Sequence, residues 1–203
     1  MKMILWPERR LPASRTAGLR QLGEVDLMDF ETVVKRRRMC REYLDREVPQ
    51  EKVDRILDLA CRYPSAGHTE PQEFIVVRDR RVKENLGRAA LGQMFVARAP
   101  LVVVVVSDTR RSAQRYGARG VRFYSIIDGA FVAMIILLAA VEEGLGACFV
   151  AAFDDREVQQ VLALPPEVRP IGIIPVGYCA EGPRKLARRS KARIVHHDRY
   201  GSD

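Results

Sequence analysis

The longest uncharged run of the chain covers residues 129–141, thirteen positions between Asp128 and the pair Glu142-Glu143. A helix that is apolar on every side has no face for water and is normally buried all round, in a protein core or in a membrane. As a helix the run would rise about 20 Å, which is well short of the ~20 residues that cross a bilayer. The pattern predicts a central helix over residues 123–143 that is covered by its own sheet, by other helices or by a second subunit.

Shorter patterns predict the elements around this helix. Gly144-Leu145-Gly146 is typical of a helix end, and an apolar strand is expected at 147–153. Amphipathic or capped segments predict helices at 30–38, 49–62, 80–90 and 154–164, and apolar runs predict strands at 74–77, 101–106 and 171–178. Residues 110–122 are interpreted as a polar, arginine-rich connection, and 192–195 as one further strand. The predicted fold is therefore α+β, a mixed central sheet of four or five strands flanked by helices, with the long buried helix at its centre.

The domain organisation follows from length and composition. With 203 residues, 47% of them hydrophobic and 30% charged, the chain is large enough for one domain with a real core. Residues 1–27 have no sustained period and are expected to be a flexible N-terminal tail or extension. A single domain is expected over 28–203.

Cysteine spacing and the first residues indicate a compartment. Cys40, Cys61, Cys148 and Cys179 are widely spaced and form no metal-ligand pattern. The sequence therefore predicts reduced thiols, no disulfide framework and no metal site, as in a cytoplasmic protein. The N-terminus shows no secretory signal.

The net charge of +8 is concentrated in two places. Residues 35–41 contribute +5 and residues 181–203 contribute +4, so the remainder is about neutral. Two compact basic clusters suit a small anionic ligand that is held from both ends. A nucleic-acid backbone fits less well because aromatic residues are not interleaved with the basic ones. A basic nucleic-acid-binding protein using residues 36–41 stays as the competing class.

Common nucleotide and catalytic motifs are absent. The glycines at 144–146 follow a helix and precede a strand, which reverses the order of a dinucleotide-binding fingerprint. No Walker-A lysine motif occurs, and His68, His196 and His197 are not at metal-ligand spacing.

The order of several short motifs resembles the nitroreductase family of FMN-dependent oxidoreductases, from residue 28 to about residue 201. The matching segments are RRMCR at 37–41, PSAG at 64–67, FVAAFD at 149–154, VGY at 176–178 and KAR at 191–193. No motif is decisive alone, but the five stand in the family's order.

The resemblance implies a homodimer with FMN at the subunit interface and NAD(P)H as co-substrate. It implies that Arg37 and Arg38 hold the phosphate and ribityl, that Arg41 faces the pyrimidine edge, and that Lys191 and Arg193 close on the phosphate. It places Pro64, Ser65 and Ala66 along the ring, and the amides of Ala151 and Ala152 near O4 and N5. Met39 stands where the family commonly has serine, His68 where it has asparagine and Glu70 where it has glutamine.

Residues 115–123, followed by Asp128-Gly129, resemble more closely the SagB/thiazole-oxidase branch, whose members oxidise azoline rings in modified peptides. That resemblance makes Tyr116 the candidate catalytic residue, because loss of a hydride from carbon also requires removal of a proton. The alternative is that this segment only anchors the central helix.

The function expected from these features is hydride transfer from NAD(P)H through FMN to a small acceptor, such as a nitroaromatic or a quinone, in a ping-pong cycle. The alternative is an FMN dehydrogenase of the SagB/thiazole-oxidase type acting on a peptide or small heterocycle. No nucleic acid and no membrane are expected as partners.

Overall fold

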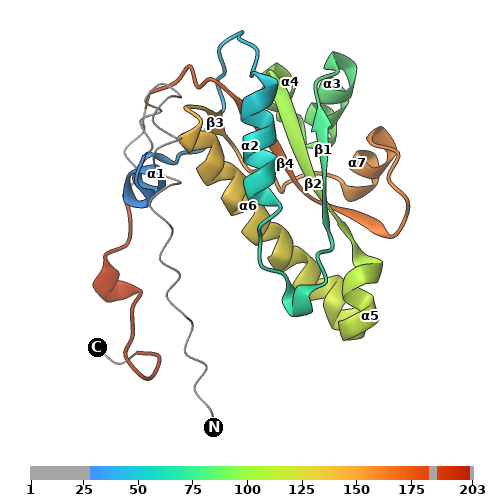
Figure 1. Ribbon diagram of the computed structural model, residues 1–203. Helices are drawn as coiled ribbons and strands as arrows, with labels where there is room; N and C mark the ends of the chain where they lie inside the picture. The colour runs from blue at the N-terminus through green and yellow to red at the C-terminus, as the bar shows by residue number, and fades with distance from the viewer. Residues whose placement is uncertain (1–27, 183–186, 202–203) are drawn as a thin grey trace, which may run out of the picture.

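A central antiparallel sheet carries the fold in the computed structural model, which describes residues 28–182 and 187–201 (Figure 1). Its strands are β1 (Gln72–Val77), β2 (Leu101–Asp108), β3 (Gly146–Ala147) and β4 (Val168–Gly177), in the order β1-β2-β4-β3. Every pair of neighbouring strands is antiparallel. Outside the strand ladders, Met39 forms an isolated parallel bridge to Ala147. The predicted α+β class and number of strands are confirmed, whereas the sheet, expected to be mixed, is antiparallel.

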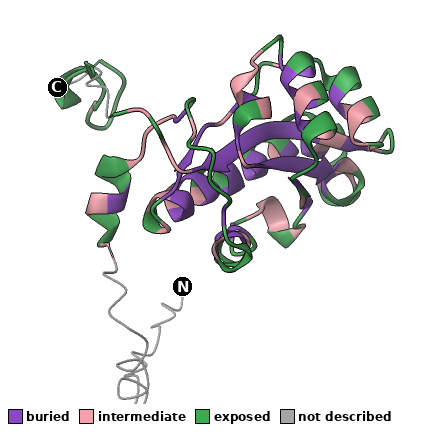
Figure 2. Cartoon of the chain, turned by 90° about the horizontal axis from the view of Figure 1, so that it is seen from above, coloured by how far each residue is buried: buried purple, intermediate pink, exposed green. Residues whose placement is uncertain are grey.

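β2 is apolar from Leu101 to Val106 because both of its faces are covered. Leu101, Val103 and Val105 belong to one buried cluster with residues of α2 (Gln50–Ala60) and α6 (Ser125–Glu142). Val102, Val104 and Val106 belong to a second cluster on the other face. That face is covered by α3 (Arg80–Ala89), α4 (Phe95–Arg98) and α7 (Asp155–Val161). The buried sheet between the two helical layers is visible in Figure 2.

The long helix α6 lies along the sheet beside α2, as predicted (Figure 1). Val132, Ile136 and Leu137 are buried in the first cluster. Its outer side remains apolar and exposed, with Phe131 48% and Met134 46% accessible. In the described part of the chain, the run Thr109–Glu142 alone has the length and hydropathy of a membrane span, and half of that apolar window is buried inside the protein. The helix is therefore a core helix with one uncovered apolar side, and the expectation that it is enclosed is met on its sheet side only.

The segment expected to be a polar connection is helical, so that expectation is wrong. α5 (Thr109–Arg119) begins at Asp108, whose side chain accepts a hydrogen bond from Arg110 N, and continues through a π-helical turn, η4 (Gly120–Tyr124), into α6. Only Ser112 of α5 is buried. Most surface helices carry an apolar stripe toward the core, but α5 buries only one residue and has none, so hydrophobic periodicity does not predict it.

Two predicted strands are shorter or absent. The strand expected at 147–153 is reduced to Gly146–Ala147 and a single bridge between Val150 and Ile173. The strand expected at 192–195 is a 3-10 turn, η5 (Lys191–Arg193). α1 (Phe30–Arg36) agrees with the predicted first helix, whereas residues 1–27 lie outside the described residues.

Cys40 and Cys179 form a disulfide, which corrects the expectation of reduced thiols. Their Cα atoms lie 5.9 Å apart although 139 residues separate them in sequence. Cys40 N donates to Ala147 O in β3, and Cys179 follows β4, the neighbour of β3. The topology of the sheet therefore brings the two sulfurs together, and spacing along the chain carries no sign of it.

Candidate functional site

The basic segment 37–41 crosses the end of the sheet beside β3. Met39 forms the bridge to Ala147, and its Sδ accepts a hydrogen bond of 3.5 Å from Phe149 N. Arg37 is the first residue after α1, and both Arg37 and Arg38 are half-buried. The segment is thus fixed by its backbone, and its guanidinium groups stand at the edge of the molecule.

Three further hydrogen bonds and one cation–ring contact involve this segment. Arg38 Nη2 donates to Glu181 O at 2.6 Å, and Arg41 N donates to Glu181 Oε1 at 2.7 Å. The hydroxyl of Tyr43 donates to Cys40 O at 2.6 Å, and burial raises the pKa of that hydroxyl, so it stays protonated. The guanidinium of Arg41 lies 5.8 Å from the centre of the Phe95 ring.

Ala151 and Ala152 lie four and five positions after Ala147, the residue of β3 that pairs with Met39. Both are exposed, and Ala152 O accepts a hydrogen bond from Gln93 Nε2 at 3.1 Å. Val150 bridges Ile173 in the middle of β4, so Ala151 and Ala152 lie farther along β4 than the pair Met39–Ala147 at its end; Phe149, between the two, contacts Met39.

The loop with Pro64, Ser65, Ala66 and His68 lies at the other end of α6 (Figure 1). Ala66 N donates to both carboxylate oxygens of Asp128, at 3.1 and 3.2 Å. Ser65 Oγ accepts from Glu70 N at 3.0 Å, which closes the loop around the 3-10 turn η3 (Ala66–His68). Within α6, Asp128 and Glu142 are fourteen residues apart, or about 20 Å along a helix. One chain therefore keeps the loop and the basic segment at opposite ends of its central helix.

Helix α5 clamps this loop from outside. Arg115 Nη1 donates to Gly67 O at 2.9 Å, and Arg111 Nη1 donates to Glu70 O at 2.8 Å. Gly67 has φ 58°, and a Cβ added there would lie 2.5 Å from the Tyr116 hydroxyl oxygen. Glycine is therefore required at this position by both its backbone angle and its neighbour.

Asp128 is the buried ionisable group beneath the loop, at 2% exposure. Burial raises the pKa of its carboxyl, and the hydrogen bond from Ala66 opposes that rise. The sequence motifs give no role to Asp128 or Arg111. A single carboxylate at the head of an otherwise apolar helix is the signal that could have identified Asp128, because a buried charge needs a specific partner.

Lys191 and Arg193 lie in η5 and are exposed. In both views the tail that carries η5 extends away from the sheet (Figures 1 and 2). The chain's own fold therefore leaves these two residues apart from the loop at 64–70.

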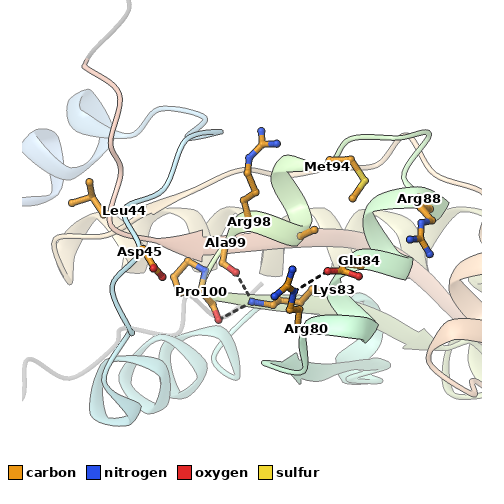
Figure 3. Close-up of a pocket in the computed structure, with 11 residues that line it drawn as sticks. Leu44, Asp45, Arg80, Lys83, Glu84, Arg88, Met94, Arg98, Ala99 and Pro100 are labelled. Carbon is orange, nitrogen blue, oxygen red and sulfur yellow. Dashed lines mark hydrogen bonds and ion pairs between the residues drawn. The ribbon is translucent and has the colours of Figure 1, made fainter.

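A hollow of about 480 Å³ opens on the face of the sheet opposite α6. It lies between α3, α4 and the segment at Leu44 and Asp45 (Figure 3). Its cationic groups do not converge on a common point. Lys83 Nζ donates to Ala99 O at 2.7 Å, and Arg80 pairs with Glu84. Arg98 points away from Lys83. None of the residues assigned by resemblance lines this hollow, so it is separate from the candidate site.

The residues at the sheet end suit the phosphate end of FMN. Arg37 and Arg38 offer guanidinium groups, which bind phosphate through paired, charge-assisted hydrogen bonds. Met39 offers a thioether where a hydroxyl is common, and that thioether is already used by Phe149 N. The donor set is therefore cationic rather than hydroxyl-based, and it fits a dianionic phosphate.

Comparisons with known proteins identify the family. The sequence model of the Nitroreductase family matches residues 34–113 and 93–178. A Methanothermobacter thermautotrophicus protein, provisionally named NADH dehydrogenase/NAD(P)H nitroreductase, is 35% identical over 165 residues, which cover 79% of this chain and 83% of that protein. A Bacillus subtilis protein named FMN reductase [NAD(P)H] is 26% identical and covers 80% of this chain and 71% of its own length.

The fold agrees with solved structures as well. A nitroreductase family protein from Streptococcus pneumoniae superposes with a TM-score of 0.76 at 25% identity, covering 83% of this chain and 99% of that one. The family's sequence model spans well over half of the chain, and the fold and the order of the motifs agree with it. This chain belongs to the nitroreductase family.

Proposed function

We propose that this chain, an FMN-dependent NAD(P)H oxidoreductase of the nitroreductase family, passes a hydride from NAD(P)H through FMN to a small acceptor such as a nitroaromatic or a quinone. The proposal includes a ping-pong cycle in the cytoplasm, in which the donor leaves before the acceptor binds. The observation that carries it is that the basic segment 37–41 pairs with Ala147 and contacts Phe149 through Met39, in the short stretch that leads to Ala151 and Ala152. Relatives whose names specify NAD(P)H and FMN support the same function.

The resemblance to the family gives these residues their proposed roles, and their chemistry agrees with those roles. Arg37 and Arg38 hold the phosphate and ribityl, and Arg41 stands at the pyrimidine edge, where a cation favours the addition of electrons to the ring. Backbone amides of Ala151 and Ala152 donate toward O4 and N5. The bound flavin supplies the two-electron chemistry, and the protein supplies binding, orientation and charge.

We propose further that the active unit is a homodimer. The loop at 64–70 and the segment at 37–41 lie about 20 Å apart along α6, which is more than one isoalloxazine ring spans. A two-fold pairing of α6 with its copy places the loop of one chain near the basic segment of the other. The exposed apolar side of α6 at Phe131 and Met134, together with Phe30 and Val34 of α1, offers the surface for such a pairing.

In this arrangement η5 also contributes to phosphate binding. The tail extends away from its own sheet, so Lys191 and Arg193 can reach the phosphate site of the partner rather than their own. FMN then lies at the interface and is held by residues of both chains.

Absorbance spectroscopy of the purified protein tests the proposal. We expect bands near ~450 and ~370 nm, and their loss when NADPH or NADH is added without oxygen. Recovery of the bands on addition of a quinone completes the cycle. A protein that takes up no FMN from solution, or a bound flavin that neither nucleotide bleaches, would overturn it.

A further inference from the structure

The surface of α5 and η4 is strongly cationic. Residues 109–124 contain five arginines and neither Asp nor Glu. Arg110 is neutralised by Asp108 at 2.9 Å and by Glu167 at 2.8 Å. In the ranges 28–182 and 187–201, the other four have no carboxylate within salt-bridge distance: Arg111, Arg115, Arg119 and Arg122. All four are exposed, so their charge is available to a ligand.

Aromatic rings stand between these arginines. The guanidinium of Arg119 lies over the rings of Phe123, at 4.6 Å, and Tyr124, at 5.4 Å. Tyr124 in turn packs against Tyr116, with ring centres 4.7 Å apart. Phe123 meets Tyr124 edge to face, and the rings of Tyr116 and Tyr124 are tilted to each other. We call this cluster of rings and Arg119, together with the exposed Arg122 beside it in sequence, the α5 platform: Tyr116, Arg119, Arg122, Phe123 and Tyr124. Guanidinium and aromatic planes are the groups on which a purine base stacks.

The α5 platform adjoins the loop that the proposed function places along the flavin ring. Arg115 and Arg111 hold that loop through Gly67 O and Glu70 O, and the Tyr116 hydroxyl lies against Gly67. Arg111 and Arg115 are thus occupied by structural contacts. Arg119 and Arg122 make no such contact with the loop. Their exposed guanidinium groups are therefore available to bind a ligand at the rim of the loop.

From these observations we infer that the α5 platform binds the phosphorylated adenosine end of NADPH, and that it makes the chain prefer NADPH to NADH. The inference rests on the proposed function. NADPH differs from NADH by a 2′-phosphate with close to two negative charges, and guanidinium groups bind such a group through charge-assisted hydrogen bonds. The adenine stacks on the rings, and Arg119 and Arg122 take the phosphate.

Binding of adenosine 2′,5′-bisphosphate and of 5′-AMP, measured by calorimetry, tests the site without turnover. We expect the bisphosphate to bind at least tenfold more tightly than 5′-AMP, and this advantage to shrink as salt rises. Arg119→Gln and Arg122→Gln should each remove most of the advantage. Arg88→Gln, which changes an exposed arginine beside the hollow near α3, is the matched control and should leave both affinities unchanged.

Steady-state kinetics give the second readout. We expect kcat/KM with NADPH to fall about tenfold or more in Arg119→Gln, and kcat/KM with NADH, which shares the adenine but lacks the 2′-phosphate, to fall about threefold or less. Equal losses with both donors would mean that Arg119 only supports the fold, and would overturn the inference. Equal affinity of the wild-type protein for the bisphosphate and 5′-AMP would overturn it too. If the bisphosphate binds as expected but neither donor reduces the flavin, the proposed function fails and the anion site stands.

Discussion

Asp128 accepts the backbone N–H of Ala66 at 3.1 Å, so a buried carboxylate at the head of the central helix holds the loop that the resemblance assigns to the flavin ring. This contact joins the most buried helix of the fold to a loop with an exposed rim. It lets one side chain affect both the stability of the domain and the shape of the candidate site.

The first prediction concerns Asp128→Asn. Burial raises the folded-state pKa of Asp128 above its ordinary value of 3.8. The stability that the neutral acid contributes is therefore fully present below the unfolded-state pKa and is lost as pH rises through the folded-state pKa. Asparagine can still accept from Ala66 and does not ionise. As pH rises from about 3 to about 7, the difference in free energy of unfolding should therefore move in favour of the variant.

Urea unfolding of both proteins over this pH range measures the effect. Asp58→Asn, which changes an exposed residue of α2, is the control and should follow the wild type. A difference between Asp128→Asn and wild type that does not vary with pH would contradict the assignment of a raised pKa.

A second prediction concerns the phosphate end of the cofactor. Arg37→Ala and Arg193→Ala should each weaken FMN binding about tenfold, because each removes charge-assisted hydrogen bonds to phosphate. Arg81→Ala, at an exposed position of α3 on the other face of the sheet, is the control. Equilibrium dialysis measures the affinities. Unchanged binding in both variants would show that the phosphate lies elsewhere.

The third prediction tests the dimer through Met134→Glu. Met134 lies on the exposed apolar side of α6, and a charge buried in an apolar interface costs several kcal/mol. We expect a folded monomer in sedimentation experiments, with FMN affinity strongly reduced. Leu59→Glu is the control, since Leu59 is 41% exposed on α2 and should tolerate the charge. A dimer of wild-type affinity in Met134→Glu would place the interface on another surface.

A fourth prediction follows from the disulfide. The bond between Cys40 and Cys179 closes a loop across 139 positions, and the chain-entropy contribution for a loop of that length is roughly 5 kcal/mol. Cys179→Ser should therefore unfold at much lower denaturant concentration than the oxidised wild type. In dithiothreitol the two should unfold alike, apart from the effect of the hydroxyl itself. Cys61→Ser removes an exposed free thiol and should change neither curve. Equal stability of Cys179→Ser and the oxidised wild type would show that the bond does not form in solution.

The sequence predicted the elements that are buried on a regular period. The valines of β2 and the apolar run of α6 are in the core because burial selects their side chains, so their patterns report their positions. The sequence pattern did not predict elements whose side chains are mostly exposed, because burial does not select their residues. α5 has one buried residue and therefore no apolar stripe, although Asp108 caps it and its arginines contact the loop.

The candidate site divides in the same way. Local motifs predicted that Arg37, Arg38 and Met39 belong to one segment, but the pairing of Met39 with Ala147 depends on the whole sheet. The disulfide has the same cause, because β3 and β4 bring Cys40 and Cys179 together across most of the chain. The length of α6 sets the distance between the loop at 64–70 and the basic segment at 37–41. Neither motif alone indicates that distance.

The last prediction uses Tyr116 to choose between the two flavin enzymes that the sequence allows. Its hydroxyl lies against Gly67 in the candidate flavin loop, so it is placed to exchange a proton with a substrate there. An NAD(P)H oxidoreductase needs no proton from it during flavin reduction. Tyr116→Phe, which keeps the ring against Tyr124, should then leave the rate of flavin reduction by NADPH within about threefold, or under ~1 kcal/mol of barrier.

A dehydrogenase of the thiazole-oxidase type would lose a general base, and flavin reduction by a model azoline should slow on the order of a hundredfold. Stopped-flow absorbance with each donor separates the two, and Tyr124→Phe is the control for loss of a neighbouring hydroxyl. We expect the small effect with NADPH and no reduction by the azoline; reduction by the azoline that depends on Tyr116, with neither nucleotide active, would establish the dehydrogenase instead.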